Sequence, residues 1–450
     1  MKEITILGAG LVGSLLSVYL AKRGYKVSVY ERRPDMRREK ITAGRSINLA
    51  LSDRGWKGLE LAGLKDSVRK IAIPMVGRMV HSVNGSQNLQ PYGKEGQAIY
   101  SVSRAALNKL LIDVSSEQTG NRFYFNQRAE IIDLEKGNIV FDSNSLIPST
   151  KSDLIFGADG AFSALRHSMQ FLDRFNLSQS YIDHGYKELT IPSGKNGEHL
   201  LHKNALHIWP RKNFMLIALP NLDGSFTCTL FFQFDGPISF SSLKTNEDVS
   251  TFFLEYFPDV VPLMPTYKED FHRNTTSSLV TVKCFPWIYK DKCCLIGDAA
   301  HAIVPFFGQG MNCGFEDCTV LYELMNQYEE DWNMVLSEFQ KLRKPNADAI
   351  ADLALNNFIE MRDLVADPYF LKKKNIERLI ADRFEGRYIS PYQMVSFSNI
   401  AYAEALEKGK AINARLEELA AVEDVEEAIT SEEMTSWIDS MFPSTPITNH

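Results

Sequence analysis

The sequence predicts a mixed α/β (α+β) fold, with a Rossmann-like nucleotide-binding domain, an inserted β-sheet domain and a helical C-terminal region. Three stretches support this prediction. The first thirty residues have the order strand, glycine-rich turn, helix and strand, residues 207–234 read as several strands, and the chain from Glu316 onward has apolar residues at helical spacing. A chain of 450 residues is long enough for two or three packed units.

The N-terminal unit carries Gly8-x-Gly10-x-x-Gly13 between the strand ITIL and an amphipathic helix, and the following strand, KVSVYE, ends at Glu31. The three glycines allow, in order, a tight turn, a close approach of the backbone to a pyrophosphate, and packing of helix on strand. The Glu31 carboxylate can accept both ribose hydroxyls of an adenosine and would repel a 2′-phosphate. We therefore expect FAD or NAD here rather than NADP, and a glycine turn without ligand is the less favoured alternative.

A second segment, CCLIGD followed by GQG, favours FAD over NAD. The strand places Asp298 at its C-terminal end, where open α/β sheets bind ligands and where a carboxylate can bond a ribityl hydroxyl. The glycines around Gln309 let the backbone pass close to a ring, and the helix that follows can direct its positive end at a reduced flavin. The Gly-Asp pair alone is commonly a strand-end turn. The expected flavin residues of this segment are Asp298, Gly310, Met311 and Asn312.

Composition excludes several other classes of protein. A net charge of −7 without a basic stripe argues against a nucleic-acid partner, and no stretch approaches the ~18 apolar residues of a membrane span. Six cysteines show no metal-ligand spacing, so no metal is expected, and free thiols fit a reducing compartment. We expect a soluble cytoplasmic protein without a membrane anchor, for which a homodimer stays open.

The three nucleotide-binding motifs are far apart in the sequence, so the nucleotide-binding domain is expected to be discontinuous. Asn84-Gly85 signals a two-residue hairpin in one insertion, and Asp223-Gly224 marks a turn in the other. The C-terminal helical pattern is expected to break at Pro345. The expected division is 1–75, 95–180 and 280–330 for the FAD-binding domain, 76–94 and 181–279 for a β-sheet substrate domain, 331–431 for the helical region, and 432–450 for a disordered tail.

Several long motifs together resemble the single-component FAD-dependent aromatic hydroxylases, and within them the kynurenine 3-monooxygenase family, from residue 4 to about residue 400. Animal members carry a hydrophobic membrane anchor where this chain ends in an acidic helical stretch. The motifs are GAGLVG, GRSINLALSDRG (44–55), GRMVHS (77–82), QPYG (90–93), YSVSR (100–104), DLIFGADGAFSALR (153–166), IDHGYKELTIP (182–192), LHIWPR (206–211), ALPNLDGSFTCTLF (218–231), LIGDAAHAIVPFFGQGMN and NNFIEMR (356–362).

The resemblance implies hydroxylation of L-kynurenine to 3-hydroxy-L-kynurenine, with tightly bound FAD and with NADPH and O2 as co-substrates. In such enzymes NADPH reduces the flavin, oxygen adds at C4a, and the resulting hydroperoxide attacks an electron-rich ring. The protein must position that ring and exclude water. No second GxGxxG is present, so NADPH has no Rossmann domain of its own and would bind transiently.

The resemblance also implies that the amino-acid end of the substrate is bound by Arg78, Tyr92, Asn357 and Tyr392. Arg78 can hold a carboxylate as a bidentate fork, and Tyr92 can add a hydroxyl donor. Taken alone, an arginine on a hairpin is more often a solvated surface charge, and Tyr392 could be a core tyrosine. Met361 shares one helix face with Asn357, which is usually only packing.

Phe231, Phe306 and Phe307 offer an apolar wall for the aromatic ring, although phenylalanines are normally core residues, and relatives can carry His at the position of Phe307. His301 could be a general base but is expected to cap or pack beside the flavin strand. By resemblance, further FAD contacts are expected at Val12, Tyr30, Arg32, Arg33, Ala50, Arg104, Ala129 and Asp159. Asp159 could equally be a turn residue.

Two alternative functions remain open from the sequence alone. One is a flavin hydroxylase of another aromatic, such as a hydroxybenzoate, which would need a relay to ionise a phenol. The other is a non-catalytic FAD-fold chaperone of prenylated proteins, of the GDP-dissociation-inhibitor kind. Such chaperones have lost the flavin anchor, whereas Asp298 and the Gly-Gln-Gly stretch are intact here.

Overall fold

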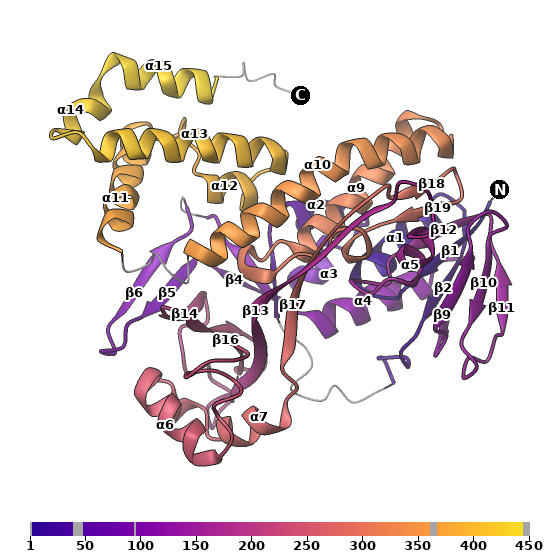
Figure 1. Ribbon diagram of the computed structural model, residues 1–450, viewed down its shortest axis with the longest axis horizontal. Coiled ribbons are helices and arrows are strands. Elements are labelled where there is room, and N and C mark those ends of the chain that lie inside the picture. Colours follow the sequence, from indigo (N-terminus) through magenta and orange to yellow (C-terminus); the bar gives the residue numbers. More distant parts are fainter. Residues whose placement is uncertain (1, 39–47, 94–95, 361–366, 444–450) are drawn as a thin grey trace.

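The computed structural model describes residues 2–38, 48–93, 96–360 and 367–443, and its core lies around two large sheets (Figure 1). The first sheet is parallel from β19 to β8, with β18 added antiparallel at one edge. Its strands in spatial order are β18 (Ile288–Tyr289), β19 (Cys293–Leu295), β12 (Leu154–Gly157), β1 (Glu3–Leu7), β2 (Lys26–Glu31) and β8 (Asn121–Phe125).

Helix α1 packs on β1 and β2 of this sheet and contacts α4 and α9. Smaller elements complete the unit, among them a three-stranded sheet beside α5 and another that contacts α3, α4 and α9. The helices are α1 (Leu11–Lys22), α2 (Asp53–Leu61), α3 (Lys65–Arg69), α4 (Arg104–Ser116), α5 (Ala164–Met169), α8 (Asp298–His301) and α9 (Gly310–Gln327), with the 3₁₀ turn η2 (Pro305–Phe307). The small sheets are β11 (Ser149–Lys151), β10 (Asn138–Phe141) and β9 (Ala129–Asp133), and β3 (Asn48–Leu51), β7 (Ile99–Ser103) and β4 (Ala72–Met75).

The second large sheet has seven strands and two differently used faces. One face packs an aromatic core under α6 and α7, and the other faces the nucleotide-binding unit. Its strands in spatial order are β17 (Ser277–Phe285), β13 (Asn176–Ile191), β16 (Phe226–Gln233), β15 (Phe214–Pro220), β14 (Ala205–Arg211), β5 (Gly77–His81) and β6 (Gln87–Pro91), and the covering helices are α6 (Asn246–Tyr256), η1 (Val261–Leu263) and α7 (Tyr267–Arg273).

The expected hairpin at Asn84-Gly85 is present as β5 and β6, which pair antiparallel at the edge of the seven-stranded sheet. Gly85 has φ +82°, a backbone conformation that favours glycine. Strand β5 joins the sheet by parallel pairing with β14, and Arg78 lies opposite Leu206 in that register. The insertion therefore delivers Arg78 to the sheet face that looks toward the nucleotide-binding unit.

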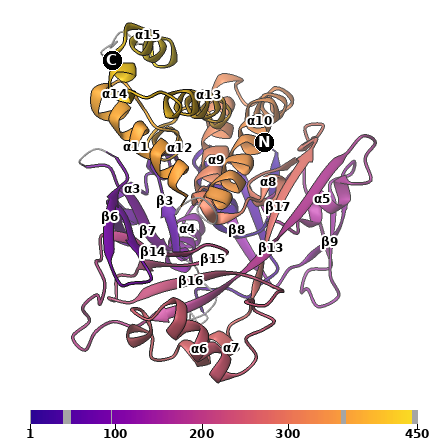
Figure 2. The same cartoon turned by 60° about the vertical axis from the view of Figure 1, so that its left-hand side comes forward.

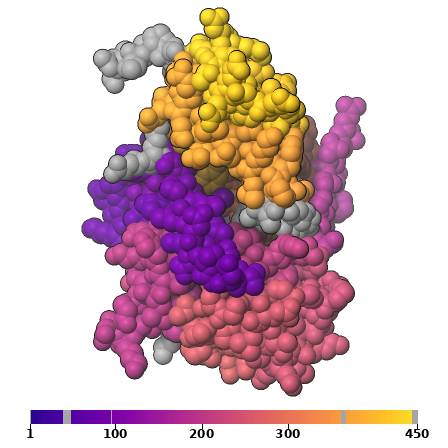
Figure 3. Space-filling model, turned by 90° about the vertical axis from the view of Figure 1, so that its left-hand side faces the viewer, coloured from indigo at the N-terminus to yellow at the C-terminus, as the bar shows by residue number. Residues whose placement is uncertain are grey.

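The C-terminal helices lie at the opposite end of the molecule from α6 and α7, as both ribbon views show (Figures 1 and 2). In the space-filling view they cap the molecule above the β5–β6 hairpin (Figure 3). They are α10 (Trp332–Ile359), α11 (Pro368–Arg383), α12 (Pro391–Ser396), α13 (Tyr402–Ala420), α14 (Val425–Thr430) and α15 (Glu432–Met441). None of the helices in the described ranges is long and apolar enough to cross a membrane.

The expected helix break at Pro345 is wrong, because α10 runs through this residue. A proline inside a helix costs about 3 kcal/mol through the lost hydrogen bond and a steric clash. Helix α10 persists because it buries Arg343, Ala347 and Ile350 and contacts α9 and α13. The actual break comes earlier, before Asp331, whose side chain caps the start of α10.

The expectation of a disordered tail over 432–450 is wrong for Glu432–Met441, which forms α15. The Ser431 hydroxyl accepts a hydrogen bond from the Met434 N–H at the helix start, and Met434 and Ile438 are buried. The sequence contains a capping serine and an apolar stripe, both of which favour a helix. The many acidic residues around them led to the prediction of disorder. Residues 444–450 lie outside the described part of the chain.

Candidate active site

A cavity of about 1010 Å³ extends between the parallel sheet and the seven-stranded sheet. It brings together most of the residues expected from the sequence. These are Gly8, Gly10, Val12, Tyr30, Glu31, Arg32, Arg33, Ala50, Arg78, Tyr92, Arg104, Ala129, Asp159, Phe231, Asp298, Phe306, Phe307, Gly310, Met311 and Tyr392. Three expected residues, Gly13, Asn312 and Asn357, do not line it, and Met361 lies outside the described residues.

The glycine turn after β1 has the geometry that a dinucleotide needs. Gly8 has φ +101°, and a Cβ there would lie 2.4 Å from the Ala158 carbonyl oxygen. A Cβ on Gly10 would meet only open space on the cavity side, so the backbone there is bare for a phosphate. Gly13 acts in the packing of helix on strand, since a Cβ there would lie 2.0 Å from the Gly8 carbonyl oxygen.

Glu31 is buried at the end of β2 and is largely occupied by the protein itself. Its Oε2 accepts a hydrogen bond from the Ala9 N–H at 2.9 Å, and its Oε1 accepts from the backbone and side chain of Arg33 at 3.0 and 2.8 Å. Burial alone would raise its pKa, but the bonds from Arg33 outweigh burial and lower it, so the carboxylate stays charged. Of its about four acceptor positions, one remains. A single ribose hydroxyl is therefore easier to satisfy than the expected pair.

Two further carboxylates lie at the wall of the cavity. Asp298 is exposed toward it at the start of α8. Asp159 accepts a hydrogen bond from the Ala164 N–H at 2.7 Å through Oδ2, while its buried Oδ1 has no partner in the described structure. Burial raises the pKa of Asp159, so a donor from a bound molecule would stabilise its charged form. An open glycine cradle and an orphaned buried oxygen fit FAD.

The loop before α9 is fixed by Asn312, whose side chain points away from the cavity. Its amide donates to the carbonyl oxygens of Ala50 and Gly308 at 2.8 and 3.0 Å, and its Oδ1 accepts from the Ser52 N–H at 3.0 Å. Gly308 has φ +68°, which closes the 3₁₀ turn η2. Asn312 therefore positions the flavin loop, and the residues at the cavity wall are Gly310 and Met311.

A buried ion network supports the turn that carries Asp298. Asp317 accepts hydrogen bonds from the Gly297 N–H at 3.0 Å, from His301 Nε2 at 2.6 Å and from Arg343 Nε at 2.7 Å. Burial raises and its two cationic neighbours lower the pKa of Asp317, and the net shift is downward. His301 therefore packs behind the flavin strand, as expected. The His301, Cys313 and Asp317 cluster would place a metal ion against the Arg343 guanidinium, which makes a metal unfavourable.

Arg78 lies at the other end of the cavity, beside two phenol rings that are stacked on each other. Its guanidinium carbon is 5.6 Å from the centre of the Tyr92 ring and 4.9 Å from that of Tyr392. The buried Tyr92 hydroxyl has no hydrogen-bond partner among the described residues. Burial raises the pKa of Tyr92, so this hydroxyl stays protonated and can donate. A cation beside an unsatisfied donor fits a ligand carboxylate.

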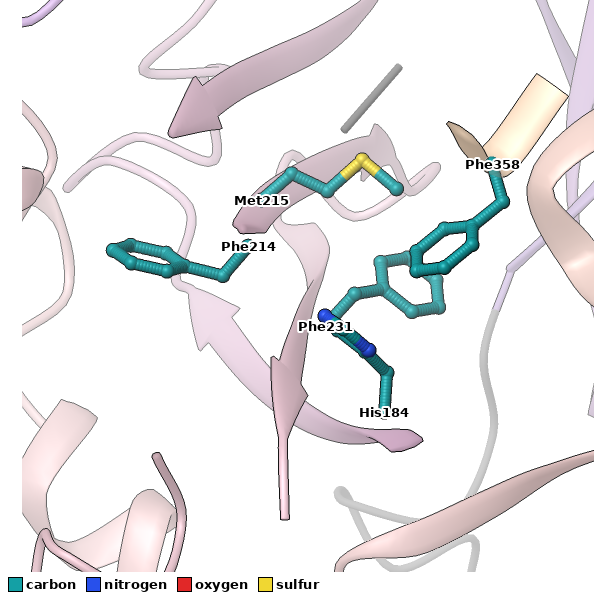
Figure 4. Close-up of a pocket in the computed structure, with 5 residues that line it drawn as sticks. All are labelled: His184, Phe214, Met215, Phe231 and Phe358. Carbon is teal, nitrogen blue, oxygen red and sulfur yellow. The ribbon is translucent and has the colours of Figure 1, made fainter. Parts of the chain in front are cut away.

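Aromatic and apolar side chains form the walls between these two ends. Phe306 is stacked on Phe358, with ring centroids 4.3 Å apart, and lies 5.0 Å from Phe231. Behind Phe231 and Met215, which also line the large cavity, a small apolar void of about 10 Å³ is enclosed by His184, Phe214, Met215, Phe231 and Phe358 (Figure 4). The void holds at most about one water-sized molecule, so the wall behind Phe231 is closely packed.

Asn357 was expected to bind the substrate, and this role remains a prediction. In the structure its amide donates to the Phe306 carbonyl oxygen at 2.6 Å. It is buried in α10 and holds the aromatic wall in place. The sequence did not indicate the contact with Phe306, because residue spacing does not show which way an amide on a helix points.

The sequence also gave no sign of the contacts between the C-terminal helices and the flavin loop. The Tyr402 hydroxyl of α13 donates to Gln309 Oε1 at 2.9 Å, and the buried guanidinium of Arg54 lies 3.9 Å from the centre of the Tyr402 ring. Arg54 and Arg343 both pair with Glu316. These charged side chains come from helices that are far apart in the sequence, and only the fold brings them together.

Comparisons with known proteins agree with this geometry. The FAD binding domain family model matches residues 1–201 and 276–354. Solved structures with the same fold include 2-methyl-3-hydroxypyridine-5-carboxylic acid oxygenase (TM-score 0.67, 20% identity, 83% of this chain and 95% of that one) and Pseudomonas aeruginosa PqsL in complex with 2-aminobenzoylacetate (TM-score 0.66, 17% identity, 80% and 97%). The fold and the cavity define a protein of the FAD-dependent monooxygenase fold.

Curated relatives place the chain more narrowly. It is 49% identical to kynurenine 3-monooxygenase of Christiangramia forsetii over 98% of both chains, and 50% identical to that of Dictyostelium discoideum over 93% of both. The Sus scrofa enzyme is 45% identical over 90% of this chain and 86% of its own length. The chain belongs to the kynurenine 3-monooxygenase family.

Proposed function

We propose that the protein hydroxylates L-kynurenine to 3-hydroxy-L-kynurenine, with FAD as bound cofactor and NADPH and O2 as co-substrates. The observation that carries the proposal is the position of Arg78 and the unsatisfied Tyr92 hydroxyl in the same cavity as the dinucleotide-binding glycines. An amino acid with an aromatic side chain fits this cavity, because its carboxylate can bind at the Arg78 end and its ring can pack against the aromatic walls. The family relatives carry this activity in their names.

The protein's first task in this proposal is to bind the amino-acid end. Arg78 holds the substrate carboxylate, and Tyr92 donates its protonated hydroxyl to the same group. The rings of Tyr92 and Tyr392, which both lie within about 6 Å of the guanidinium, help to keep it in place. Because the substrate end of the cavity is fixed in this way, the aromatic ring is directed toward the loop at residues 308–310.

The second task is to keep water from the reacting ring. Phe231, Phe306 and Phe307 present apolar surface, and only a small void is left behind Phe231. FAD, when bound and reduced by NADPH, supplies the activation of dioxygen. Asp298 would hold its ribityl chain, and the start of α9 would face its ring.

Product analysis tests this proposal. Purified FAD-loaded protein is mixed with NADPH, O2 and either L-kynurenine or 4-hydroxybenzoate, and both NADPH oxidation and products are measured. L-kynurenine should accelerate flavin reduction at least tenfold in stopped-flow traces and yield 3-hydroxy-L-kynurenine. Acceleration by 4-hydroxybenzoate and not by L-kynurenine would show that the substrate is another aromatic compound. A protein that does not bind FAD would favour the chaperone alternative.

We further propose that the protein acts in the cytoplasm. Its six cysteines are all buried and unpaired, as expected in a reducing compartment. Cell fractionation with an antibody against the chain tests this, and recovery in the membrane pellet would contradict it.

A further inference from the structure

Behind the strand that carries Arg78, two buried histidines and a carboxylate form a chain of hydrogen bonds. His81 Nδ1 lies 3.1 Å from Asp259 Oδ2, and His81 Nε2 lies 2.8 Å from His207 Nδ1. His207 Nε2 lies 3.0 Å from the carbonyl oxygen of His202. Both rings are at most 1% exposed. The two histidines come from the motifs GRMVHS and LHIWPR, to which the proposed reaction assigns no role beyond Arg78.

The number of hydrogen atoms that this row of hydrogen bonds requires can be counted. Each of its three contacts needs one hydrogen, because a carbonyl oxygen and a carboxylate can only accept. Two neutral imidazoles supply only two hydrogens. His207 must donate through Nε2 to the carbonyl, so its Nδ1 accepts from His81 Nε2, and His81 must also donate through Nδ1 to Asp259. His81 therefore carries both ring protons and one positive charge.

The surroundings support this distribution. Burial lowers the pKa of His207 to about 4, which keeps that ring neutral. Burial alone would raise the pKa of Asp259, but the hydrogen bonds from His81 and from Trp209 Nε1, the latter at 2.8 Å, lower it. The Trp209 ring is stacked on that of His81 at 4.0 Å. A protonated Asp259 as the source of the third hydrogen is thereby disfavoured.

Other charged groups around His81 hold their state across the relevant pH range. Arg211 donates through Nη1 to the His81 carbonyl oxygen at 2.9 Å, and its Nε donates to the Tyr256 carbonyl oxygen. The titratable and charged groups that face the chain are Asp259 from the loop after α6, His207 and Arg211 from β14, and His202 before β14. An arginine stays charged at any accessible pH, and the low pKa of His207 keeps that ring neutral, so neither group changes its charge near neutrality.

We propose that Asp259, His81 and His207 form a proton-holding relay that positions β5, so that the hold on the substrate carboxylate by Arg78 depends on the extra proton. This inference rests on the proposed function for its substrate. Residues 77, 79 and 81 alternate with residue 78 along the strand, so the relay holds β5 from the face opposite Arg78. The three members are positioning residues, because none of them lines the cavity.

Loss of the proton has a defined consequence. With two hydrogens left for three contacts, one contact must place two lone pairs against each other inside the protein. That contact opens, and the end of β5 is then held by strand pairing, by Arg211 and by the stack on Trp209, without the full set of hydrogen bonds. The protonated form makes the native contacts, so its contribution to stability is complete at low pH and is lost as the pH rises through the titration of the relay.

Replacement of Asp259 by asparagine separates this account from ordinary packing. The amide introduced by Asp259→Asn can place its nitrogen at the position of Oδ2 and donate to His81 Nδ1, so all three contacts are made with two neutral imidazoles. The hydrogen bond from Trp209, which reaches the same atom, is then lost in this variant. Asp235→Asn, which changes an exposed carboxylate of the same domain, serves as the matched control.

Three measurements test the proposal. Long-range ¹H–¹⁵N spectra of ¹⁵N-histidine-labelled protein should show His81 protonated on both nitrogens and His207 on Nε2 alone at pH 7. The dissociation constant for L-kynurenine should rise about tenfold between pH 6.5 and pH 8.5 in the original protein and the Asp235→Asn control, but less than twofold in Asp259→Asn. The melting temperature should show the same difference in pH dependence. Ligand titration cancels in the comparison, since all proteins meet the same ligand.

Each outcome has a meaning. A neutral His81 at pH 7 overturns the relay, whether or not Asp259→Asn folds. A doubly protonated His81 with an unchanged pH dependence of binding in Asp259→Asn overturns its positioning role. If L-kynurenine binds none of the proteins, the proposed function has failed, and the spectra and melting curves still decide whether the relay holds its proton.

Discussion

The ring of Tyr392 is stacked on the ring of Phe307, with centroids 5.5 Å apart and planes 18° apart. The Tyr392 ring is also stacked on that of Tyr92, with centroids 5.3 Å apart. Tyr392 belongs to α12, whereas Phe307 precedes the flavin loop and Tyr92 follows the inserted hairpin. One residue of the C-terminal region thus joins the two ends of the cavity, and the helical region forms part of the active site.

Replacement of Tyr392 by alanine should open this stack. Stacked aromatic pairs contribute about 0.5–1.5 kcal/mol each beyond burial, so loss of two pairs should weaken L-kynurenine binding about tenfold or more. Tyr392→Phe keeps the stack and serves as the control. Equilibrium titration of the flavin fluorescence measures both, and equal loss in the two variants would show that the hydroxyl, rather than the stack, matters.

Arg78→Ala should weaken L-kynurenine binding about 100-fold, because a carboxylate in the cavity then loses its charged partner. FAD content should be unchanged, since Arg78 lies at the end of the cavity far from the glycine turn. Arg78→Lys keeps the charge but loses the bidentate fork and should fall between the two. Flavin absorbance of the purified variants gives the FAD content, and loss of flavin in Arg78→Ala would mean that this residue holds the cofactor.

Tyr92→Phe removes only the hydroxyl group and therefore distinguishes an effect on substrate binding from an effect on stability. The hydroxyl has no partner in the described protein, so its removal should change the free energy of unfolding by less than about 0.5 kcal/mol. A hydrogen bond to a charged carboxylate is worth about 1.5–3 kcal/mol, so binding of L-kynurenine should weaken at least tenfold. Thermal melts and binding titrations of the same samples measure both effects, and a destabilised variant with normal binding would contradict the assignment.

Asp317→Asn should destabilise the protein by about 3–5 kcal/mol, because Arg343 and His301 lose a buried counter-charge. Asp352→Asn, which breaks a solvent-exposed pair with Lys283, should cost less than about 1 kcal/mol. The folded-state pKa of Asp317 is lowered, so its contribution is present above the pKa of the unfolded chain and is lost as the pH falls. Melting curves between pH 3 and pH 7 should therefore flatten in Asp317→Asn, and an unchanged acid limb would contradict this role.

The sequence predicted features that depend on local geometry. The glycine turn, the hairpin at Asn84-Gly85 and the position of Asp298 after its strand each follow from residue types within a few positions. The site residues that line the cavity were placed by their motifs, and their roles remain predictions. Features that depend on direction or on distant partners were not predicted, such as the hydrogen bond from Asn357 to Phe306 and the continuation of α10 through Pro345. The ion network around Asp317 and the histidine relay need elements more than a hundred residues apart or from different helices, which no spacing rule encodes.

A crystal structure of the FAD-loaded protein with L-kynurenine tests the central claim most directly. The flavin ring is predicted beside residues 308–310, and the substrate carboxylate within hydrogen-bond distance of both the Arg78 guanidinium and the Tyr92 hydroxyl, with the aniline ring against the phenylalanine wall. A carboxylate bound elsewhere, or a flavin ring that occupies the space beside Arg78, would contradict the account.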